Sequence, residues 1–233
     1  MKNIIRFIRE NPVFADILLL ILSMSLIHLF YVLYVSPIST KELEAALSLG
    51  SVPERTLWLI LKDFEQELCL ILGLWCLFLI FSRYQMRNED NQLIAFDFLS
   101  LSENGADIDS IERRLEEAET LGMKGYMLAG VRIYVETFRS STSSELAKRE
   151  ALDYFILTEE NLDAKLNLIN YILWAIPSVG FLGTVRGIGQ ALSGVDEALS
   201  GDIAGVALNL GIAFNSTFVA ILLSVLLTFI SMG

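Results

Sequence analysis

The stretch "IPSVGFLGTVRGIGQAL", residues 176–192, decides the fold because its glycines lie inside an apolar run that can cross a membrane. Gly180, Gly183 and Gly187 follow each other at steps of three and four residues, so one face of a helix carries all three. A face of small residues lets membrane helices approach closely, where lipid supplies no hydrophobic drive for association. The stretch therefore predicts a membrane helix that packs tightly against a neighbour.

The same glycines do not form a phosphate-binding loop. A Walker loop requires a lysine directly after its last glycine, and neither Gly183 nor Gly187 is followed by one. A dinucleotide fingerprint requires a preceding strand within a βαβ unit, and the sequence has no such unit. Nucleotide binding is therefore not expected.

Four apolar runs organise the chain of 233 residues, 54% of which are hydrophobic. A helix needs about 20 apolar residues to cross the hydrocarbon core, so we predict an all-α polytopic membrane protein with four transmembrane helices. The first run follows Lys2, Arg6 and Arg9, as in a signal peptide. This run is too long for the apolar region of a signal peptide, and no small-x-small cleavage site follows it. We therefore expect it to be retained as a membrane anchor.

The basic residues predict the orientation, because cytoplasmic segments carry an excess of lysine and arginine. Three lie in residues 1–12 and ten in residues 82–167. Residues 36–67 carry three among six acidic residues, and residues 193–202 carry none. The amino terminus and the central region are therefore expected in the cytoplasm.

The predicted segments are a cytoplasmic amino-terminal segment (1–12), transmembrane helix 1 (13–35), a periplasmic loop with an amphipathic helix (36–63), transmembrane helix 2 (64–84), a cytoplasmic helical domain (85–165), transmembrane helix 3 (166–192), a periplasmic turn (193–202) and transmembrane helix 4 (203–232). Within the cytoplasmic domain, Ile108, Ile111, Leu115 and Ala118 form one helical stripe that ends at Gly122. The sequence stops directly after an apolar run, which leaves open whether the native protein continues past Gly233.

Several other function classes are disfavoured by composition. The net charge of −11 and the lack of a basic patch with interleaved aromatic residues argue against nucleic-acid binding. Cys69 and Cys76 lie about 10 Å apart on one predicted helix, too far for a mutual disulfide, and are expected to be packing residues. No zinc-ligand spacing occurs, and His28 has no visible partner.

A polar stripe runs along the fourth apolar run. Asn209, Ala213, Thr217, Ala220 and Ser224 share one helix face, which predicts contact with another helix or with a hydrated path. Thr184 lies 17 residues before Gly201 and Thr217 lies 16 after it. If the chain turns near Gly201, the two hydroxyl groups lie at the same depth on neighbouring antiparallel helices.

Ion translocation normally involves a carboxylate within the membrane, and the third and fourth runs contain none. Asp16 lies at the cytoplasmic end of the first run, and Glu65 and Glu67 lie at the outer end of the second, where all three are interpreted as interfacial. An acid for ion transport is therefore expected from another chain.

Two segments now indicate a family. The stretch "LDAKLNLINYILWAIPSVGFLGTVRGIG", residues 162–189, resembles the cytoplasm-to-membrane helix of the MotA/TolQ/ExbB proton channel family, with its pattern A-P-x-x-G-L-L-G-T-V-x-G-[IM]. "GIAFNSTFVAIL", residues 211–222, is similar to the family's last span. The two spans before the cytoplasmic domain match the four-span MotA layout, whereas TolQ and ExbB have one span there.

The resemblance implies a homopentameric ring in the bacterial inner membrane around a dimer of a single-span partner (MotB-, TolR- or ExbD-like), whose membrane aspartate binds H⁺ or Na⁺. It implies an ion-driven motor subunit, not an enzyme, with no cofactor besides the translocated ion. The implied ion-path or partner-contact residues are Thr184, Thr217, Asn209, Ser216 and Arg186, and the implied helix-packing residues are Pro177, Gly180, Gly183, Gly187, Ala213 and Ala220.

Three positions depart from the family pattern. Arg186 stands where the family commonly has an apolar residue, and Ala220 replaces a glycine. The proline of the family's last-span pattern is absent, since Ser224 follows Leu223 there. The sequence leaves open whether Arg186 snorkels outward, pairs with an acid or sets the potential near the partner carboxylate. It does not decide between H⁺ and Na⁺, nor which process is powered (flagellar rotation, gliding, outer-membrane transport or phage defence).

Two alternative functions remain. In a non-conducting membrane scaffold, the polar and small-residue stripes would be packing seams and Arg186 would pair structurally. A self-sufficient transporter is disfavoured because no buried acid and no pair of broken-helix repeats occurs in the sequence.

Overall fold

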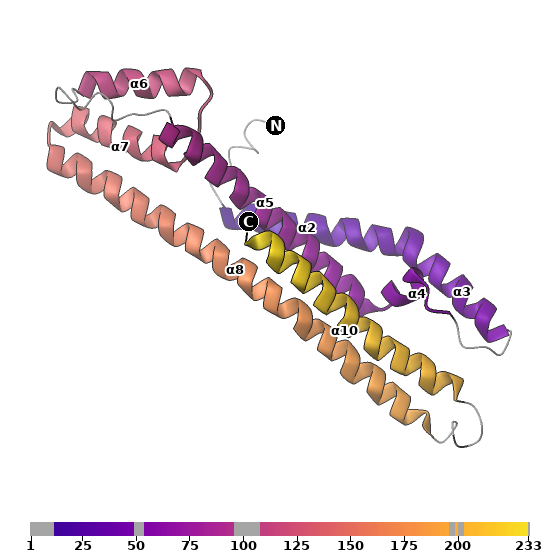
Figure 1. Ribbon diagram of the computed structural model, residues 1–233. Helices are drawn as coiled ribbons and strands as arrows, with labels where there is room; N and C mark the ends of the chain where they lie inside the picture. Colours follow the sequence, from indigo (N-terminus) through magenta and orange to yellow (C-terminus); the bar gives the residue numbers. More distant parts are fainter. Residues whose placement is uncertain (1–11, 49–53, 96–107, 196–198, 200–202, 233) are drawn as a thin grey trace. The chain divides into compact units, whose positions relative to one another are not determined.

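The computed structural model describes residues 12–48, 54–95, 108–195, 199 and 203–232 (Figure 1). These residues contain no β-strand, and four of their helices are long and apolar enough to cross a membrane. This confirms the predicted all-α class with four membrane-spanning helices. Most of the amino-terminal segment, residues 96–107 and most of the predicted turn at 193–202 lie outside the described residues.

The chain divides into two compact units. The first, called the membrane unit here, comprises residues 1–80 and 169–233; the second, called the helical unit, comprises residues 81–168. The helices are α2 (Pro12–Phe30), η1 (Tyr31–Val35), α3 (Ser36–Ser48), α4 (Leu57–Leu61), α5 (Phe64–Ala95), α6 (Ile108–Thr120), α7 (Tyr126–Ser141), α8 (Ser144–Ser193) and α10 (Ala204–Ser231).

The helix of the first predicted span continues past Val35, where the sequence analysis begins a loop. Helix α2 passes through the π-helical turn η1 directly into α3, which ends at Ser48. The Ser36 backbone N–H donates to the Tyr31 carbonyl, five residues back. Pro37, the next residue, has no N–H to donate, which accounts for the local change in hydrogen bonding without a break in the helix.

The helical unit has a small core of its own. Leu115, Ala118 and Leu128 are buried in it, with Met127 and Val131 packed against them. The predicted stripe on α6 thus faces the core, and the helix ends as predicted next to Gly122, whose φ of 75° is favourable only for glycine. At Gly130 on α7, an added Cβ atom would overlap the ring of Phe155 on α8, so a larger residue there would have to displace that ring.

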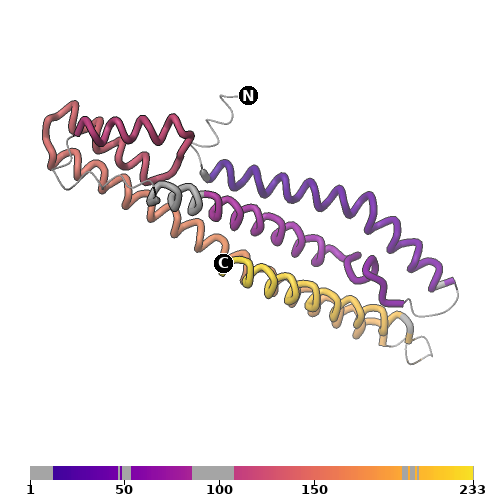
Figure 2. The backbone as a smooth tube through the Cα atoms, turned by 45° about the horizontal axis from the view of Figure 1, so that its top comes forward, coloured from indigo at the N-terminus to yellow at the C-terminus, as the bar shows by residue number. Residues whose placement is uncertain are grey.

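The membrane unit is built around three helices. Figures 1 and 2 both show α10 lying along the second half of α8. Helix α5 packs on both through a face of small or polar residues, because Cys69 and Cys76 are fully buried and Cys69 Sγ lies 3.6 Å from the Ile176 carbonyl oxygen. An added Cβ atom at Gly73 would lie 2.7 Å from Leu223 Cδ2. The two cysteines are therefore packing residues, as expected.

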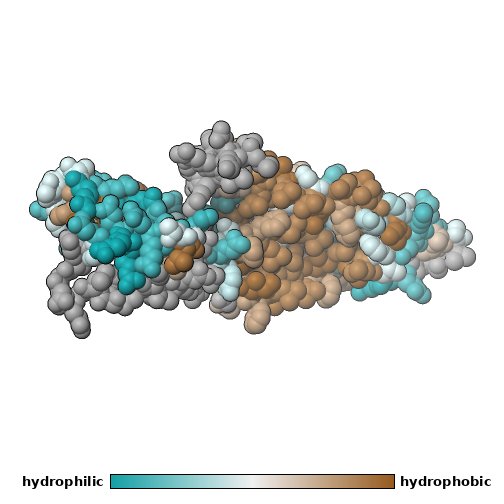
Figure 3. Space-filling model, turned by 90° about the horizontal axis from the view of Figure 1, so that it is seen from above, coloured by the Kyte–Doolittle hydropathy of each residue, from teal (hydrophilic) through white to brown (hydrophobic). Residues whose placement is uncertain are grey.

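The outward-facing side chains of the membrane unit are largely apolar. Figure 3 shows a broad apolar surface over its helices and hydrophilic side chains gathered on the helical unit. Ile21, Leu29, Phe181, Leu222 and Phe229 are each at least 46% exposed, which a water-facing surface would rarely tolerate in such number. This surface is suited to lipid or to contact with other membrane helices.

Pro177 lies inside α8 and leaves one backbone carbonyl without its helical hydrogen-bond donor, which α10 replaces. Because proline has no N–H, the carbonyl four residues earlier, that of Leu173, loses its helical donor. The Ser224 hydroxyl of α10 donates to this carbonyl at 3.1 Å. Polar backbone groups in a membrane must find a partner within the protein, so Ser224 and Pro177 act as a matched pair.

We predict that Ser224→Ala lowers the free energy of unfolding by about 1 kcal/mol, because the Leu173 carbonyl loses its donor. Pro177→Ala restores the helical N–H, so Ser224→Ala should cost much less in that background. The measurement is the melting temperature of the four detergent-purified proteins of this double-mutant cycle. Equal costs in both backgrounds would contradict the pairing.

Candidate functional site

The glycine face of α8 lies directly against α10. An added Cβ atom on Gly180 would lie 2.5 Å from Ala220 Cβ, and one on Gly187 would lie 2.8 Å from Ala213 Cβ. At Gly183 the added atom would lie 2.5 Å from Ser216 Cβ and 3.1 Å from Glu65 Cγ. Real Cβ atoms essentially never come within 3.0 Å of another atom. Glycine at these three positions therefore allows the backbones of α8 and α10 to meet.

At this contact the Thr184 and Thr217 hydroxyl oxygens hydrogen-bond to each other. Thr184 Oγ1 also lies 3.1 Å from the Ala213 carbonyl oxygen, and both hydroxyls lie 3.3 Å from that of Gly180. Four oxygen atoms therefore meet at one point between α8 and α10. This contact agrees with the equal depth that the register about Gly201 predicts, while the part these threonines play in transport stays a prediction.

Helix α5 reaches the same level through Gln66. Its side chain is fully buried, and Gln66 Nε2 donates to Ser216 Oγ at 3.4 Å. Ser216 is itself 1% exposed and its hydroxyl donates to the Ile212 carbonyl at 2.9 Å. Ser216, expected to lie on the ion path, is therefore packed between helices and tied to α5.

Arg186 forms an ion pair with Glu65. The guanidinium donates through Nε to Glu65 Oε1 at 2.6 Å and through Nη2 to Oε2 at 2.8 Å, a bidentate geometry. Asp63 Oδ1 lies 3.5 Å from the same Nη2. Of the three roles left open for Arg186, the structure supports pairing with an acid. Glu65 is only 7% exposed, because α8 covers it.

The second acid of this cluster, Asp63, lies just before α5. Burial raises the pKa of its carboxyl group, while Lys62 and Arg186 act in the opposite direction. One carboxylate oxygen, Oδ2, is buried and has no hydrogen-bond partner among the described residues. Asp63 is therefore only weakly held by Arg186, in contrast to Glu65.

His28 also has an acidic partner that the sequence does not reveal. His28 Nδ1 and Glu67 Oε1 lie 2.8 Å apart, and this pair joins α2 to α5. The imidazole is 65% exposed, so it is not enclosed in a relay of buried groups. Within the described ranges, no three His, Cys, Asp or Glu side chains are grouped so as to hold a metal ion.

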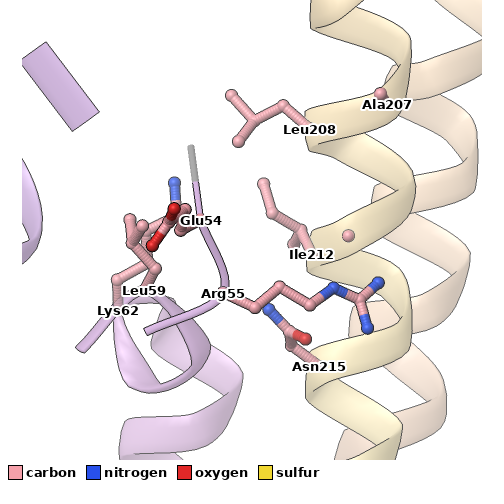
Figure 4. A pocket seen from close by; sticks show the side chains of 9 residues that line it. Glu54, Arg55, Leu59, Lys62, Ala207, Leu208, Ile212 and Asn215 are labelled. Atoms are coloured by element: carbon pink, nitrogen blue, oxygen red, sulfur yellow. The ribbon is translucent and has the colours of Figure 1, made fainter. Parts of the chain in front are cut away.

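Asn209 is not brought to the threonine pair. It lies eight residues before Thr217, or about 12 Å along α10, where its backbone oxygen contacts the Gly187 position. A pocket of about 260 Å³ opens on the other side of α10 and is lined by Glu54, Arg55, Leu59, Lys62, Ala207, Leu208, Gly211, Ile212 and Asn215. Figure 4 shows the Arg55 side chain extending towards α10 beside Asn215.

Residues 120–232, which contain α7, α8 and α10, match the profile of the MotA/TolQ/ExbB proton channel family. The match covers just under half of the chain and shows the likeness to that family over this segment. The resemblance in the sequence analysis is thereby confirmed and extended to a longer segment. No curated protein and no solved structure matched the chain.

The match to a family of proton channels favours a role of the chain in ion transport. Together with the four apolar helices it makes the chain a multi-pass membrane protein. The glycine face, both threonines and Arg186 all lie within the matched segment. Glu65, Gln66 and Asp63 lie before it, so the acid that pairs with Arg186 comes from the part of the chain outside the family match.

Sequence reasoning missed Gln66 and the partnership of Glu65. A membrane-embedded arginine requires a counter-charge, which was one signal available. A second was the polar face Gln66, Cys69, Gly73 and Cys76, whose three- and four-residue steps indicate a buried stripe on α5. Neither signal specifies which of Asp63, Glu65 and Glu67 is the partner.

We predict that Gly183→Ala lowers the melting temperature of the purified chain, because its new methyl group must displace Ser216 and Glu65. An overpacked site costs about 1–3 kcal/mol. The matched control is Gly189→Ala on the same helix, because nothing lies within 4 Å of the Cβ atom added there. Equal melting temperatures for the two variants would contradict the close contact at Gly183.

Proposed function

We propose that the chain is a ring subunit of an ion-driven motor or energy transducer that uses the proton- or sodium-motive force. The observation that carries the proposal is the contact between the Thr184 and Thr217 hydroxyls, the two positions that the sequence resemblance equates with threonines of the family pattern. In this proposal a homopentameric ring surrounds a dimer of a single-span partner that carries a membrane aspartate. Ion binding at that aspartate drives rotation of the ring.

The chemistry of paired hydroxyls suits this role. A hydroxyl group has one donor and two acceptor lone pairs, and its proton can rotate. The pair can therefore accept a hydrogen bond from a protonated carboxyl group and donate one to a carboxylate. The carbonyl oxygens of Gly180 and Ala213 add acceptors, so the site can bind a partner acid in either protonation state without any charge of its own.

Membrane orientation follows from the charge distribution and is part of the proposal. With the amino terminus and the helical unit in the cytoplasm, α8 runs outward and α10 returns. The Glu65–Arg186 pair then lies towards the outer side of the membrane relative to the threonine pair. The proposed location is the bacterial inner membrane, where an electrochemical gradient releases about 2.3 kcal/mol per charge per 100 mV.

We predict that Thr217→Val abolishes coupled ion flux while the complex with the partner still assembles, because valine keeps the volume and removes the hydroxyl. The measurement is proton and sodium flux in liposomes that contain the chain co-purified with a single-span, aspartate-bearing partner. A complex whose partner carries asparagine in place of that aspartate should also assemble and lose coupled ion flux. Thr228→Val is the matched control, since among the described residues its hydroxyl bonds only to the Ser224 carbonyl of its own helix.

Full flux in Thr217→Val would contradict the role of the hydroxyl pair. An intact complex that carries no flux under either gradient, also after removal of any periplasmic plug on the partner, would favour the alternative function of a non-conducting scaffold.

A further inference from the structure

The pocket beside α10 combines charged and apolar walls. Two cations, Arg55 and Lys62, line it together with the amide of Asn215, and Figure 4 shows Arg55 extending towards α10. Apart from Glu54, the rest of the lining is apolar or glycine. The volume of about 260 Å³ is below the about 300–1,000 Å³ of pockets that enclose a whole small ligand. The pocket therefore suits the polar part of a larger amphiphilic molecule.

The two cations of this pocket are not neutralised by ion pairs. No acid of the described residues lies within ion-pair distance of Arg55 or Lys62. Two acids are nevertheless close, because Glu54 lines the same pocket and Asp63 interacts electrostatically with Lys62. The neighbouring ion pair of Arg186 adds one charge of each sign. Positive and negative charges thus balance among these residues, which favours a ligand that carries a phosphate and an ammonium group together.

The pocket lies at the end of the membrane-crossing part of α5. The segment of α5 that can span a membrane begins at Phe64, two residues after Lys62. Charged groups of two other helices lie at this level, since His28 of α2 and Arg186 of α8 each pair with an acid in the first turn of α5. Charged side chains are costly within the hydrocarbon core. Their presence at one level on three helices indicates the zone of the lipid headgroups, next to that core.

An exposed apolar strip continues from the pocket along α10. Ala207 and Gly211 line the pocket, and Phe214 and Phe218 follow at steps of three and four residues, so all four share one helix face. The two phenylalanines are 59% and 58% exposed. In the proposed orientation they lie on the cytoplasmic side of the pocket, towards the hydrocarbon core. A molecule with its headgroup in the pocket can therefore place an apolar chain over these rings, which favours a lipid over a soluble ligand.

We propose that this pocket binds the headgroup of a phospholipid that carries a primary ammonium group, such as phosphatidylethanolamine. Arg55 and Lys62 bind the phosphate, because charge-assisted hydrogen bonds to phosphate are strong. Glu54 accepts a hydrogen bond from the ammonium group, which requires an ammonium with N–H donors. The inference does not depend on ion transport, because it concerns only the binding of a lipid.

The test measures lipid binding to the purified full chain by native mass spectrometry. It compares phosphatidylethanolamine with phosphatidylglycerol of equal acyl chains, which has the phosphate but no ammonium group. We expect phosphatidylethanolamine to bind more tightly, and Arg55→Gln to weaken its binding on the order of tenfold. Glu54→Gln should abolish the preference between the two lipids. Lys41→Gln is the matched control, because this exposed lysine of α3 loses the same charge but does not line the pocket.

A second pair of variants tests the pocket itself. Nothing lies within 4 Å of a Cβ atom added at Gly211, so Gly211→Leu occupies space in the pocket without displacing a neighbour of that atom. Gly205→Leu on the same helix is the matched control, because its surroundings are equally open and it does not line the pocket. We expect only Gly211→Leu to weaken binding of phosphatidylethanolamine, on the order of tenfold. If Arg55→Gln fails to fold, this comparison decides alone.

Three results would overturn the inference. The first is equal lipid binding by the two glycine variants. The second is binding of free phosphorylethanolamine as tight as that of the lipid, which would make the pocket a site for a soluble ligand. The third is weaker binding of the single-span partner to Gly211→Leu with unchanged lipid binding, which would make the pocket a docking site for a polypeptide.

Discussion

The membrane unit depends on the close contact between α8 and α10. In water, burial of apolar side chains would drive two such helices together, but lipid is as apolar as the side chains themselves. Association must therefore come from close packing and from hydrogen bonds between helices. Gly180, Gly183 and Gly187 supply the packing, since any side chain at these positions would overlap Ser216, Ala220 or Ala213. The threonine hydroxyls can meet only because the two backbones are this close.

Three further interactions follow from the need to satisfy polar groups away from water. Pro177 leaves a carbonyl without its donor, and Ser224 donates to it. Arg186 brings a charge into the helix, and Glu65 neutralises it. Ser216 sits in the seam, and Gln66 bonds to it from α5. In each case a polar group on α8 or α10 finds its hydrogen-bond or charge partner on a neighbouring helix. In two of the three cases that neighbour is α5.

Much of this arrangement could be predicted from the sequence, and the limits have a physical cause. The apolar runs gave the helices, because span length is set by the bilayer. The glycine spacing gave the packing face, because a helix repeats every 3.6 residues. The end of the helix that begins at Pro12 could not be predicted from hydropathy, because a π-turn carries this helix past Pro37. Such a turn depends on local hydrogen bonding, which hydropathy does not describe. The partner of Arg186 depended on how α5 is rotated against α8, which follows from tertiary packing.

The ion pair lies at a position where this chain differs from the family pattern that it resembles. Arg186 stands where that pattern has an apolar residue, and an arginine there is costly unless it is satisfied. Its acid, Glu65, is on a helix outside the family match, and it reaches Arg186 only by passing the bare backbone of Gly183, 3.1 Å from where a Cβ would be. The glycine that lets α10 approach on one side thus admits the α5 carboxylate on another. A change at Gly183 would therefore disturb the contact between α8 and α10 and the ion pair together, which makes Gly183 the residue that links the two.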